Sequence, residues 1–347
     1  MKKHFNILFL ADSGIGNAIE ALYAVEYCLK QGVDAAIFLN KVNKSFQLYL
    51  HECYGNVILN DLNGVSCKYL IHSETFVESF SIPYEHYFYL KPDAQSSAVL
   101  SETEQYLSIV KALFPSKNGH EELTFLKENY SEVIRNIVPE NKIVLYPGGS
   151  SFIPVRRWPH YKKLIEKLGN ENIVIIGGHD DITFSNSYIY PPYISNILPQ
   201  KILNSKALWS FLKSFGMLTP YAHFFGIEKN ENAYINTLSW HELVALLRRC
   251  KSFVGNDGGL SHLAGACNTK GFILFGPTSV GKNRPYSTTI KTIQKNYSCQ
   301  PCQFGLGGIT MTKHYVNCPF QVKCMNEISV QEVIQGLSQP VQISQHT

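Results

Sequence analysis

The chain alternates buried-strand patterns with helical patterns along most of its 347 residues. Short apolar runs end in glycine or a polar residue, and stretches with apolar residues three and four apart follow several of them. This alternation is typical of parallel sheets, because a parallel connection between strands needs a crossover, usually a helix. The expected strands lie near residues 6–10, 35–39, 57–59, 68–71, 142–146, 172–176, 252–254 and 271–275.

These expected strands form two series, separated by a polar stretch that ends near Pro139. We therefore expect two Rossmann-like α/β domains, residues 1–139 and 140–347, which face each other across a cleft. The stretch 181–236 is rich in Tyr, Phe and Pro and shows no clear period. We interpret it as an insertion in the second domain, either a surface excursion or an element that binds an acceptor or partner.

Composition disfavours several classes of protein. The formal net charge of +4 is too small to indicate nucleic acid as a partner, although it suits an anionic ligand or peripheral contact with anionic lipid. No stretch approaches the roughly 20 apolar residues of a membrane span, and the first apolar run ends at Asp12 without a signal-peptide cleavage site. We expect a cytoplasmic protein, with peripheral contact at the inner face of the cytoplasmic membrane left open, whose cysteines are reduced or metal-bound.

The most informative motif follows the expected strand at 252–254. Here an acid and two glycines lead into a helical pattern. Glycines let backbone N–H groups approach an anion, and the first turn of a helix adds unpaired donors, whereas the alternative is an ordinary capped helix with glycines for packing. The predicted phosphate site consists of Asp257, Gly258, Gly259, Ser261 and His262.

Three more strand ends of the second half carry glycine and polar residues, and parallel strands bring such ends to one sheet edge. Arg156 and Arg157 supply forked donors suited to phosphate oxygens, with a solvated pair at a helix start as the alternative. Asp180 or Asp181 would accept hydrogen bonds from a ribose or cap a helix. The other expected donor-binding residues are Gly148, Gly149, Ser150, Gly178, Gly276, Pro277 and Thr278.

Gly14 and Gly16 form a tight turn after the first expected strand. This turn is not a dinucleotide-binding fingerprint, because the third glycine would fall at Ile19 and the strand at 35–39 ends in Asn40 rather than in an acid. The sequence therefore disfavours a nicotinamide-dependent dehydrogenase.

Six motifs of the second half, taken together, resemble glycosyltransferase family 9, the lipopolysaccharide heptosyltransferases. They are residues 146–150, 157–159, 176–178, 238–243, 256–264 and 275–278. The resemblance implies a GT-B fold, with a nucleotide-sugar donor on the second domain and the acceptor on the first, and inverting transfer that needs no metal for catalysis. It also implies that Arg157 contacts the donor diphosphate, that the 257–262 element wraps the donor, and that an acid near 176–178 binds the ribose.

One position departs from the family pattern. The family's catalytic aspartate would stand at Asn17, and an amide cannot deprotonate an acceptor hydroxyl. The candidate bases are Asp12 at the strand end and Glu20 one helical turn after Asn17; alternatively Asn17 positions the acceptor and the base lies elsewhere, or catalysis has been lost. Glu20 as a plain surface residue of the helix is also open.

Four cysteines form two pairs within residues 299–324. Four thiolates are the ligand set of a tetrahedral zinc or iron site, and unligated thiols or disulfides are the alternatives. We expect a structural zinc or iron ion held by Cys299, Cys302, Cys318 and Cys324.

The sequence thus predicts an inverting glycosyltransferase that moves a sugar, a heptose according to the resemblance, from a nucleotide-diphosphate donor such as ADP-heptose. The expected acceptor is a saccharide, a lipid-linked saccharide or a protein, and no nucleic acid is expected. One alternative is a non-catalytic GT-B protein that binds a sugar nucleotide or acts as a scaffold, favoured by Asn17 and the insertion. The other is a GT-B sugar-nucleotide epimerase, which would need acids that the sequence does not single out.

Overall fold

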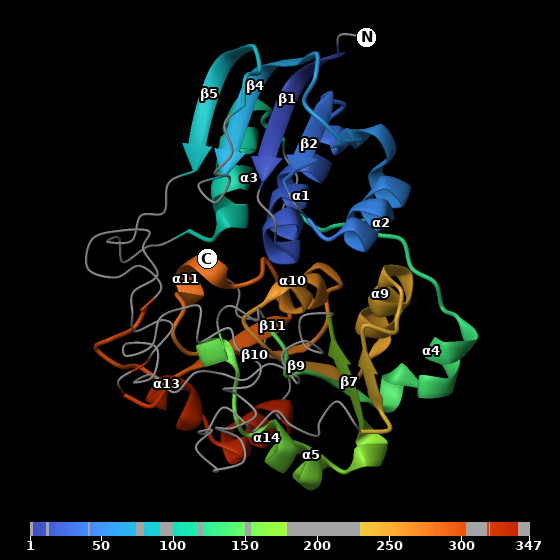
Figure 1. Ribbon diagram of the computed structural model, residues 1–347, viewed down its shortest axis with the longest axis vertical. Coiled ribbons are helices and arrows are strands. Elements are labelled where there is room, and N and C mark those ends of the chain that lie inside the picture. The colour runs from blue at the N-terminus through green and yellow to red at the C-terminus, as the bar shows by residue number, and fades with distance from the viewer. Residues whose placement is uncertain are drawn as a thin grey trace, which may run out of the picture.

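The computed structural model describes residues 3–11, 14–40, 42–73, 80–90, 100–116, 121–149, 154–178, 230–302, 318 and 320–338. These residues form two α/β domains, which lie one above the other in Figure 1. Among the described helices, none is long and apolar enough to cross a membrane.

The first domain contains a parallel five-stranded sheet with the strand order β3-β2-β1-β4-β5. Its strands are β1 (Lys3–Ala11), β2 (Ala35–Leu39), β3 (Ile58–Leu59), β4 (Val65–Ser73) and β5 (Tyr84–Leu90). Behind the sheet in Figure 1 lie α1 (Ile15–Lys30) and α3 (Glu102–Leu113), and α2 (Lys44–Tyr54) lies at its right-hand side.

The second domain contains a parallel six-stranded sheet with the strand order β11-β10-β9-β6-β7-β8. Its strands are β6 (Ile143–Tyr146), β7 (Ile173–Gly177), β8 (Ala233–Ile235), β9 (Ser252–Asn256), β10 (Gly271–Phe275) and β11 (Ile290–Gln294). One face packs on α9 (Trp240–Arg249) and α10 (Gly259–Ala266), and the other on α5 (Tyr161–Leu168) and α14 (Val330–Ser338). Short helices are α4 (Glu132–Ile137), α11 (Val280–Asn283) and α13 (Lys323–Asn326).

Alternate residues of the central strands enter different cores, as the two-residue period of a strand requires. In β1, Ile7 and Phe9 pack toward α1, whereas Leu8 and Leu10 belong to a separate cluster on the other face. The first of these clusters continues into the second domain, where it includes the buried residues of α9 and α10. The two domains therefore share one apolar core at their junction.

The eight predicted strands are confirmed, as are the helix after Gly16 and the helix at 161–168. The interpretation of residues 181–236 as an insertion is wrong at the end of this stretch, because Ala233–Ile235 form strand β8 of the second sheet and pair with β7. Residues 181–229 of that stretch lie outside the described residues.

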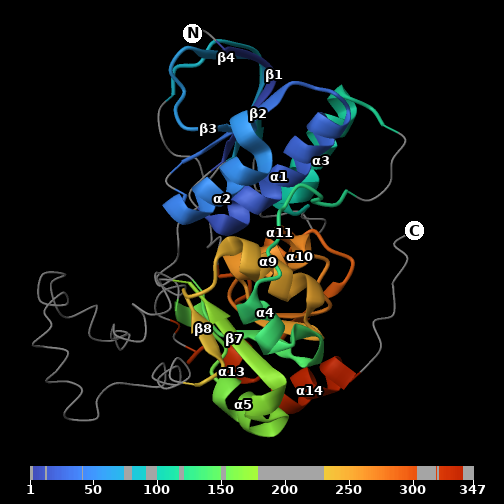
Figure 2. The ribbon, with the colours of Figure 1, turned by 90° about the vertical axis from the view of Figure 1, so that its right-hand side faces the viewer.

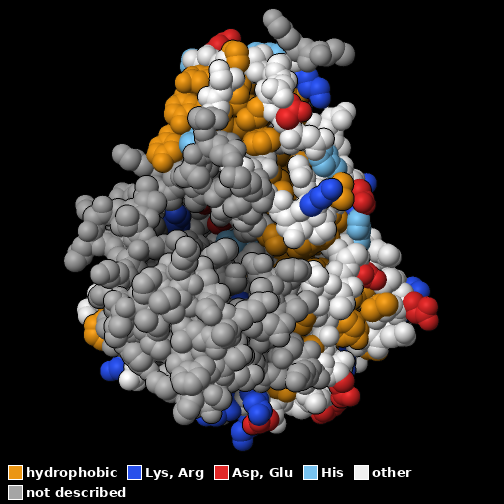
Figure 3. All heavy atoms as spheres, viewed as in Figure 1, with side chains coloured by type: hydrophobic (Ala, Val, Ile, Leu, Met, Phe, Trp, Pro, Cys, Tyr) orange, Lys and Arg blue, Asp and Glu red, His pale blue; other side chains and the backbone are white. Residues whose placement is uncertain are grey.

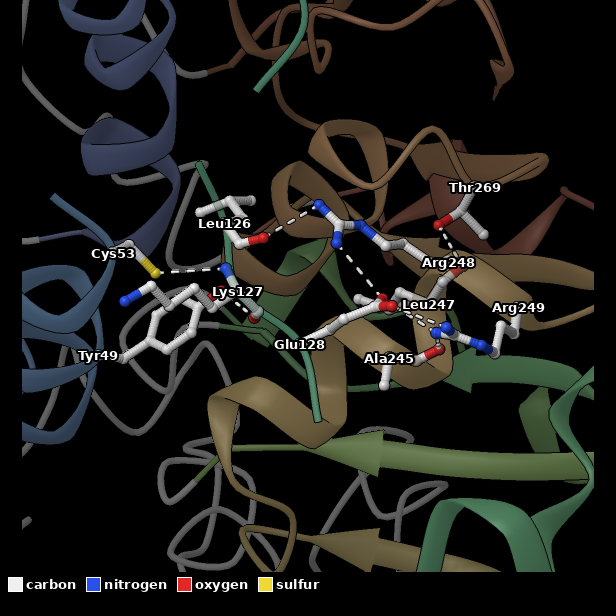
Figure 4. A network of polar contacts seen from close by, with 10 residues as sticks. All are labelled: Tyr49, Cys53, Leu126, Lys127, Glu128, Ala245, Leu247, Arg248, Arg249 and Thr269. Carbon is white, nitrogen blue, oxygen red and sulfur yellow. Dashed lines mark hydrogen bonds and ion pairs between the residues drawn. The ribbon is translucent and has the colours of Figure 1, made fainter. Parts of the chain in front are cut away.

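The chain passes between the domains along residues 121–131, which run down to α4 at the right-hand side of Figure 1 and down the middle of Figure 2. Figure 4 shows how this segment is fixed to both domains. The hydroxyl of Tyr49 in α2 donates to the carbonyl of Lys127 at 2.9 Å, and Glu128 accepts from Arg249 of α9 at 2.7 Å and from Arg248 at 3.3 Å. The connection is thus tied to one helix of each domain.

Candidate functional site

The N-termini of α1 and α10 meet at the junction of the two domains. A Cβ atom at Gly259 would lie 2.8 Å from Cβ of Ile15, and one at Gly16 would lie 3.0 Å from Cδ2 of His262. Any larger residue at Gly259 would force the helices apart, and Gly16 leaves almost no room for one. These glycines therefore have a packing role between the domains, in addition to the phosphate-binding role predicted for Gly259.

Beside this contact, ionisable side chains from both domains are buried together. Oε1 of Glu20 in α1 lies 3.8 Å from Nδ1 of His262 in α10, and both side chains are under a tenth exposed. Burial raises the pKa of Glu20 well above its usual value; Glu102 raises this pKa further, whereas Lys282 opposes the rise. Burial also lowers the pKa of His262 to about 4. At neutral pH this imidazole is uncharged and can donate or accept one hydrogen bond per nitrogen.

Glu102 is the second buried carboxyl of the first domain at this edge. It is the first residue of α3, and its Oε1 accepts a hydrogen bond from the hydroxyl of Ser73, the last residue of β4, at 2.7 Å. Two residues later, Glu104 accepts from Arg284 of the second domain at 2.8 Å. The start of α3 therefore joins α1 in facing the second domain.

Asp257 lies at the end of β9 and is buried. Its Oδ2 lies 3.6 Å from Nη1 of Arg156 and accepts a hydrogen bond from Nδ2 of Asn283 at 3.1 Å. The carboxylate thus fixes two side chains that follow neighbouring strands. Whether it also takes a ribose hydroxyl stays a prediction.

Asn256 connects the loops that follow β6 and β9. Its Nδ2 donates to the carbonyls of Pro147 and Gly148 at 2.8 and 2.9 Å, and its Oδ1 accepts from the backbone N–H of Trp158 at 3.1 Å. The neighbouring Arg157 donates to the carbonyl of Gly149 at 2.6 Å. The strand ends predicted to form one site therefore do lie together, held by a buried amide that the sequence did not single out.

The loop after β10 is held by the segment that carries the first cysteine pair. Gln300 donates to the carbonyl of Gly276 at 2.5 Å, and the backbone N–H of Cys302 donates to the carbonyl of Pro277 at 2.8 Å. Gln294, the last residue of β11, donates to the carbonyl of Thr278 at 3.3 Å. The cysteine segment therefore supports one of the predicted donor-binding loops.

The four cysteines lie close enough to influence one another. Burial and neighbouring cysteines of the set together raise the pKa of Cys302 to about 11 and that of Cys324 to about 12, with burial as the larger cause. Within the described ranges, however, no three His, Cys, Asp or Glu side chains are placed to hold a metal ion. A metal at these cysteines stays a prediction.

Several predicted residues remain to be placed. Asp12, Ser150 and Asp180 lie outside the described residues. The side chain of Asn17 folds back toward Gly14, where a Cβ atom would lie 3.3 Å from its Nδ2. Gly178 follows β7 at the same sheet edge as the other loops, as predicted.

Two groups that the structure adds to the site are Glu102 and Lys282, whereas Arg156 was already a candidate phosphate-binding residue in the sequence. Glu102 lies between Ser101 and Glu104, which form a capping box. This sequence pattern predicts the start of a helix but does not indicate a functional residue. Lys282 lies in α11, after the loop that follows β10, and the basic residues of the run Gly281-Lys282-Asn283-Arg284 are the only sequence signal for it. Figure 3 shows acidic, basic and histidine side chains in the recess where the two lobes meet.

Known proteins that are similar to this chain include heptosyltransferases. The model of a family described as glycosyltransferase family 9 (heptosyltransferase) matches residues 232–305. The lipooligosaccharide heptosyltransferase 2 of Haemophilus influenzae is 27% identical over 165 residues, which cover 46% of this chain and 39% of that protein. The chain thus spans about two fifths of the length of the curated relatives that it matches.

Solved structures match over much more of the chain. The E. coli heptosyltransferase WaaC with ADP has a TM-score of 0.55 at 12% identity, covering 97% of this chain and 100% of that one. The dodecameric iron-containing heptosyltransferase TibC of enterotoxigenic E. coli, in complex with ADP-D-β-D-heptose, has a TM-score of 0.53 at 14% identity, covering 97% and 76%.

The two parallel sheets and these neighbours define a two-domain protein with the GT-B fold. Within that class, this chain is similar to the heptosyltransferases of glycosyltransferase family 9, as its matches to the family model and to the curated relatives show.

Proposed function

We propose that the chain is an inverting glycosyltransferase that transfers a heptose from ADP-heptose to a saccharide or protein acceptor, without a metal ion in the chemical step. The observation that carries this proposal is the meeting of Glu20, from the first domain, with His262, at the start of α10 in the second. A carboxyl on the acceptor side and a strand-end loop on the donor side are the two components that sugar transfer needs.

The donor side of the proposal is supported by the loops of the second domain. When the acceptor oxygen attacks the anomeric carbon, the bond to the diphosphate breaks and negative charge grows on the leaving group. Arg156 and Arg157 lie on the loop before α5, beside the ends of β6 and β9, and Lys282 lies in α11 after β10. Fixed cations and backbone N–H groups at such a place stabilise developing charge.

On the acceptor side, Glu20 would take the proton of the acceptor hydroxyl as the new bond forms. Only the ionised carboxylate can do this, and a raised pKa makes that carboxylate a stronger base. Activity should therefore increase as the pH rises through the pKa of Glu20, which lies above the usual 4.5. Neutral His262 would orient this carboxyl or a sugar hydroxyl.

The test of the base is Glu20→Gln, assayed by ADP release from ADP-heptose with a panel of lipid-linked saccharide, free saccharide and protein acceptors. We expect turnover to fall by roughly 10²–10⁴, with ADP affinity in calorimetry unchanged. Glu132→Gln, at an exposed carboxylate of α4, is the control and should keep full activity. Equal turnover in Glu20→Gln and the wild type would remove Glu20 from the mechanism.

The test of the donor site is ADP affinity in Arg157→Ala and Asp257→Ala. Each should weaken binding by roughly 1–3 kcal/mol, because each removes a charge that holds the donor or its loops. Unchanged affinity in both variants would reject the donor site. A wild type that binds ADP-heptose yet releases no ADP with any acceptor would favour the binding-protein alternative, to which Asn17 points.

A further inference from the structure

Strand β5 forms one edge of the first sheet, and in the part of the chain that the structure describes no strand pairs with it on the side away from β4. Successive peptide groups of a strand point to opposite sides. About half of the N–H and C=O groups of Tyr84–Leu90 therefore point away from β4, as a row of donors and acceptors that another strand could pair.

The side chains of this strand are unusually exposed for their size. Tyr84, Tyr87 and Tyr89 are 47%, 43% and 42% exposed. The rings of Tyr84 and Tyr87 lie 5.5 Å apart, and Tyr89 stacks on His72 of β4 at 5.4 Å. Figure 3 shows apolar side chains gathered at the upper left, over β5. Aromatic rings that are already ordered lose little entropy on contact, which is why tyrosine is frequent in interfaces.

The sequence of β5 also lacks the residues that commonly protect an edge strand. Lysine, proline and bulges are the common protections. The strand Tyr84-Glu85-His86-Tyr87-Phe88-Tyr89-Leu90 contains neither lysine nor proline, and its register with β4 is uninterrupted from Tyr69↔His86 to Ser73↔Leu90. A long, unprotected and aromatic edge is a surface that another strand can extend.

We propose that β5 pairs antiparallel with β5 of a second copy of this chain, which joins the two five-stranded sheets across a two-fold axis. A two-fold contact covers both exposed edges at once, and such dimers are the commonest oligomers. Symmetry requires the residue at the axis to face its own copy. With the axis at His86, Glu85 faces Tyr87 of the second copy, and with the axis at Tyr87 it faces Tyr89.

Both registers thus place the one acid of the strand opposite a phenol that can donate to it. The same registers place Tyr84 opposite Phe88 or Leu90 on the other face of the sheet. Cross-strand aromatic, apolar and hydrogen-bonded pairs of this kind stabilise sheets. The sequence of β5 is therefore complementary to itself when reversed, which favours a second copy over an unrelated strand.

The experiment is sedimentation velocity on the full chain over a range of concentrations. The wild type should form a dimer, and Tyr87→Glu should raise the dissociation constant roughly tenfold or more, because the new carboxylate faces Glu85 of the second copy in one register and its own copy in the other. Leu48→Glu is the control: Leu48 is 55% exposed on α2, and the variant should dimerise like the wild type. A monomeric wild type, or a Tyr87→Glu variant that dimerises unchanged, would overturn the proposal.

Hydrogen exchange of the wild type provides a second measurement that does not depend on a variant folding. The amides of residues 84–90 should exchange more slowly as protein concentration rises from mainly monomer to mainly dimer. Exchange there that is independent of concentration would place any dimer interface elsewhere and reject pairing through β5.

Discussion

Two buried glutamates of α1 occupy very different surroundings. Glu26 accepts hydrogen bonds from the hydroxyl of Tyr54 at 2.7 Å and from the backbone N–H groups of Thr124 and Phe125 at 2.9 and 3.0 Å. Glu20 instead lies beside neutral His262, and its pKa is raised by burial and by Glu102. One carboxylate is held by donors, and the other is disfavoured in its charged form.

This difference predicts opposite effects of two matched substitutions on stability. Folding raises the pKa of Glu20 above its unfolded value near 4.5. The contribution of this side chain to the stability of the fold is therefore fully present below pH 4.5 and is lost as the pH rises through the folded pKa. Glu20→Gln should therefore gain about 1–3 kcal/mol of unfolding free energy over the wild type at pH 8, and little at pH 4.

Glu26→Gln should lose about 1–3 kcal/mol, because the amide presents N–H groups to donors that need an acceptor. Urea unfolding at both pH values measures each difference. A Glu20→Gln variant less stable than the wild type at pH 8 would show that the buried carboxyl is stabilising, contrary to its surroundings.

At the residue scale, the sequence predicted those members of the site that stand in a local pattern. Glu20 is one helical turn from Asn17, and Asp257 and His262 are five residues apart in one motif. Glu102 and Lys282 could not be predicted, because only the packing of α3 and α11 against the domain junction brings their charges near Glu20.

At the scale of elements, the contact between the N-termini of α1 and α10 depends on glycine. Gly259→Ala should cost about 1–3 kcal/mol of stability, since the new methyl group meets Cβ of Ile15 at 2.8 Å unless the helices separate. Gly178→Ala is the matched control, because no atom of the described residues would lie within 4 Å of a Cβ atom there. Thermal unfolding distinguishes the two, and equal midpoints for both variants would contradict close packing of the helices.

The cysteine segment is the second element with a testable role. We expect Cys299, Cys302, Cys318 and Cys324 to hold one zinc or iron ion that fixes the segment under the loop at 276–278, since four thiolates leave no open position for substrate. Elemental analysis of untagged protein should find about one ion per chain, absent in Cys299→Ser/Cys302→Ser. Removal by a chelator should lower thermal stability before activity falls. Metal-free protein with full stability would reject the site.

The sequence predicted elements best where burial is strongest. The central strands β1, β6 and β9 read as apolar runs because both of their faces are covered. Strand β5 is different: its residues are largely exposed on both faces, so no alternation of apolar and polar residues marks it. An alternation of apolar and polar residues arises when one face of a strand is buried, so an edge strand with little burial does not show it.

At the scale of the whole molecule, the two-domain architecture followed from the alternation of strands and helices, but the way the domains join did not. The sequence suggested two halves across a cleft. The structure shows an apolar core shared by α1, α2, α9 and α10, and a connecting segment fixed by Glu128 to Arg248 and Arg249. These contacts join residues that are far apart in the chain, so no local pattern in the sequence predicts them.

The described chain crosses between its domains once, at residues 128–131, and α14 packs on α5 in its own domain rather than returning to the first. As far as the described residues go, each domain is therefore made from one uninterrupted length of polypeptide. During synthesis the first can complete its sheet before any strand of the second has left the ribosome. Two fragments divided at Tyr130 should likewise reassemble when co-expressed, held by the shared core without a peptide bond between them.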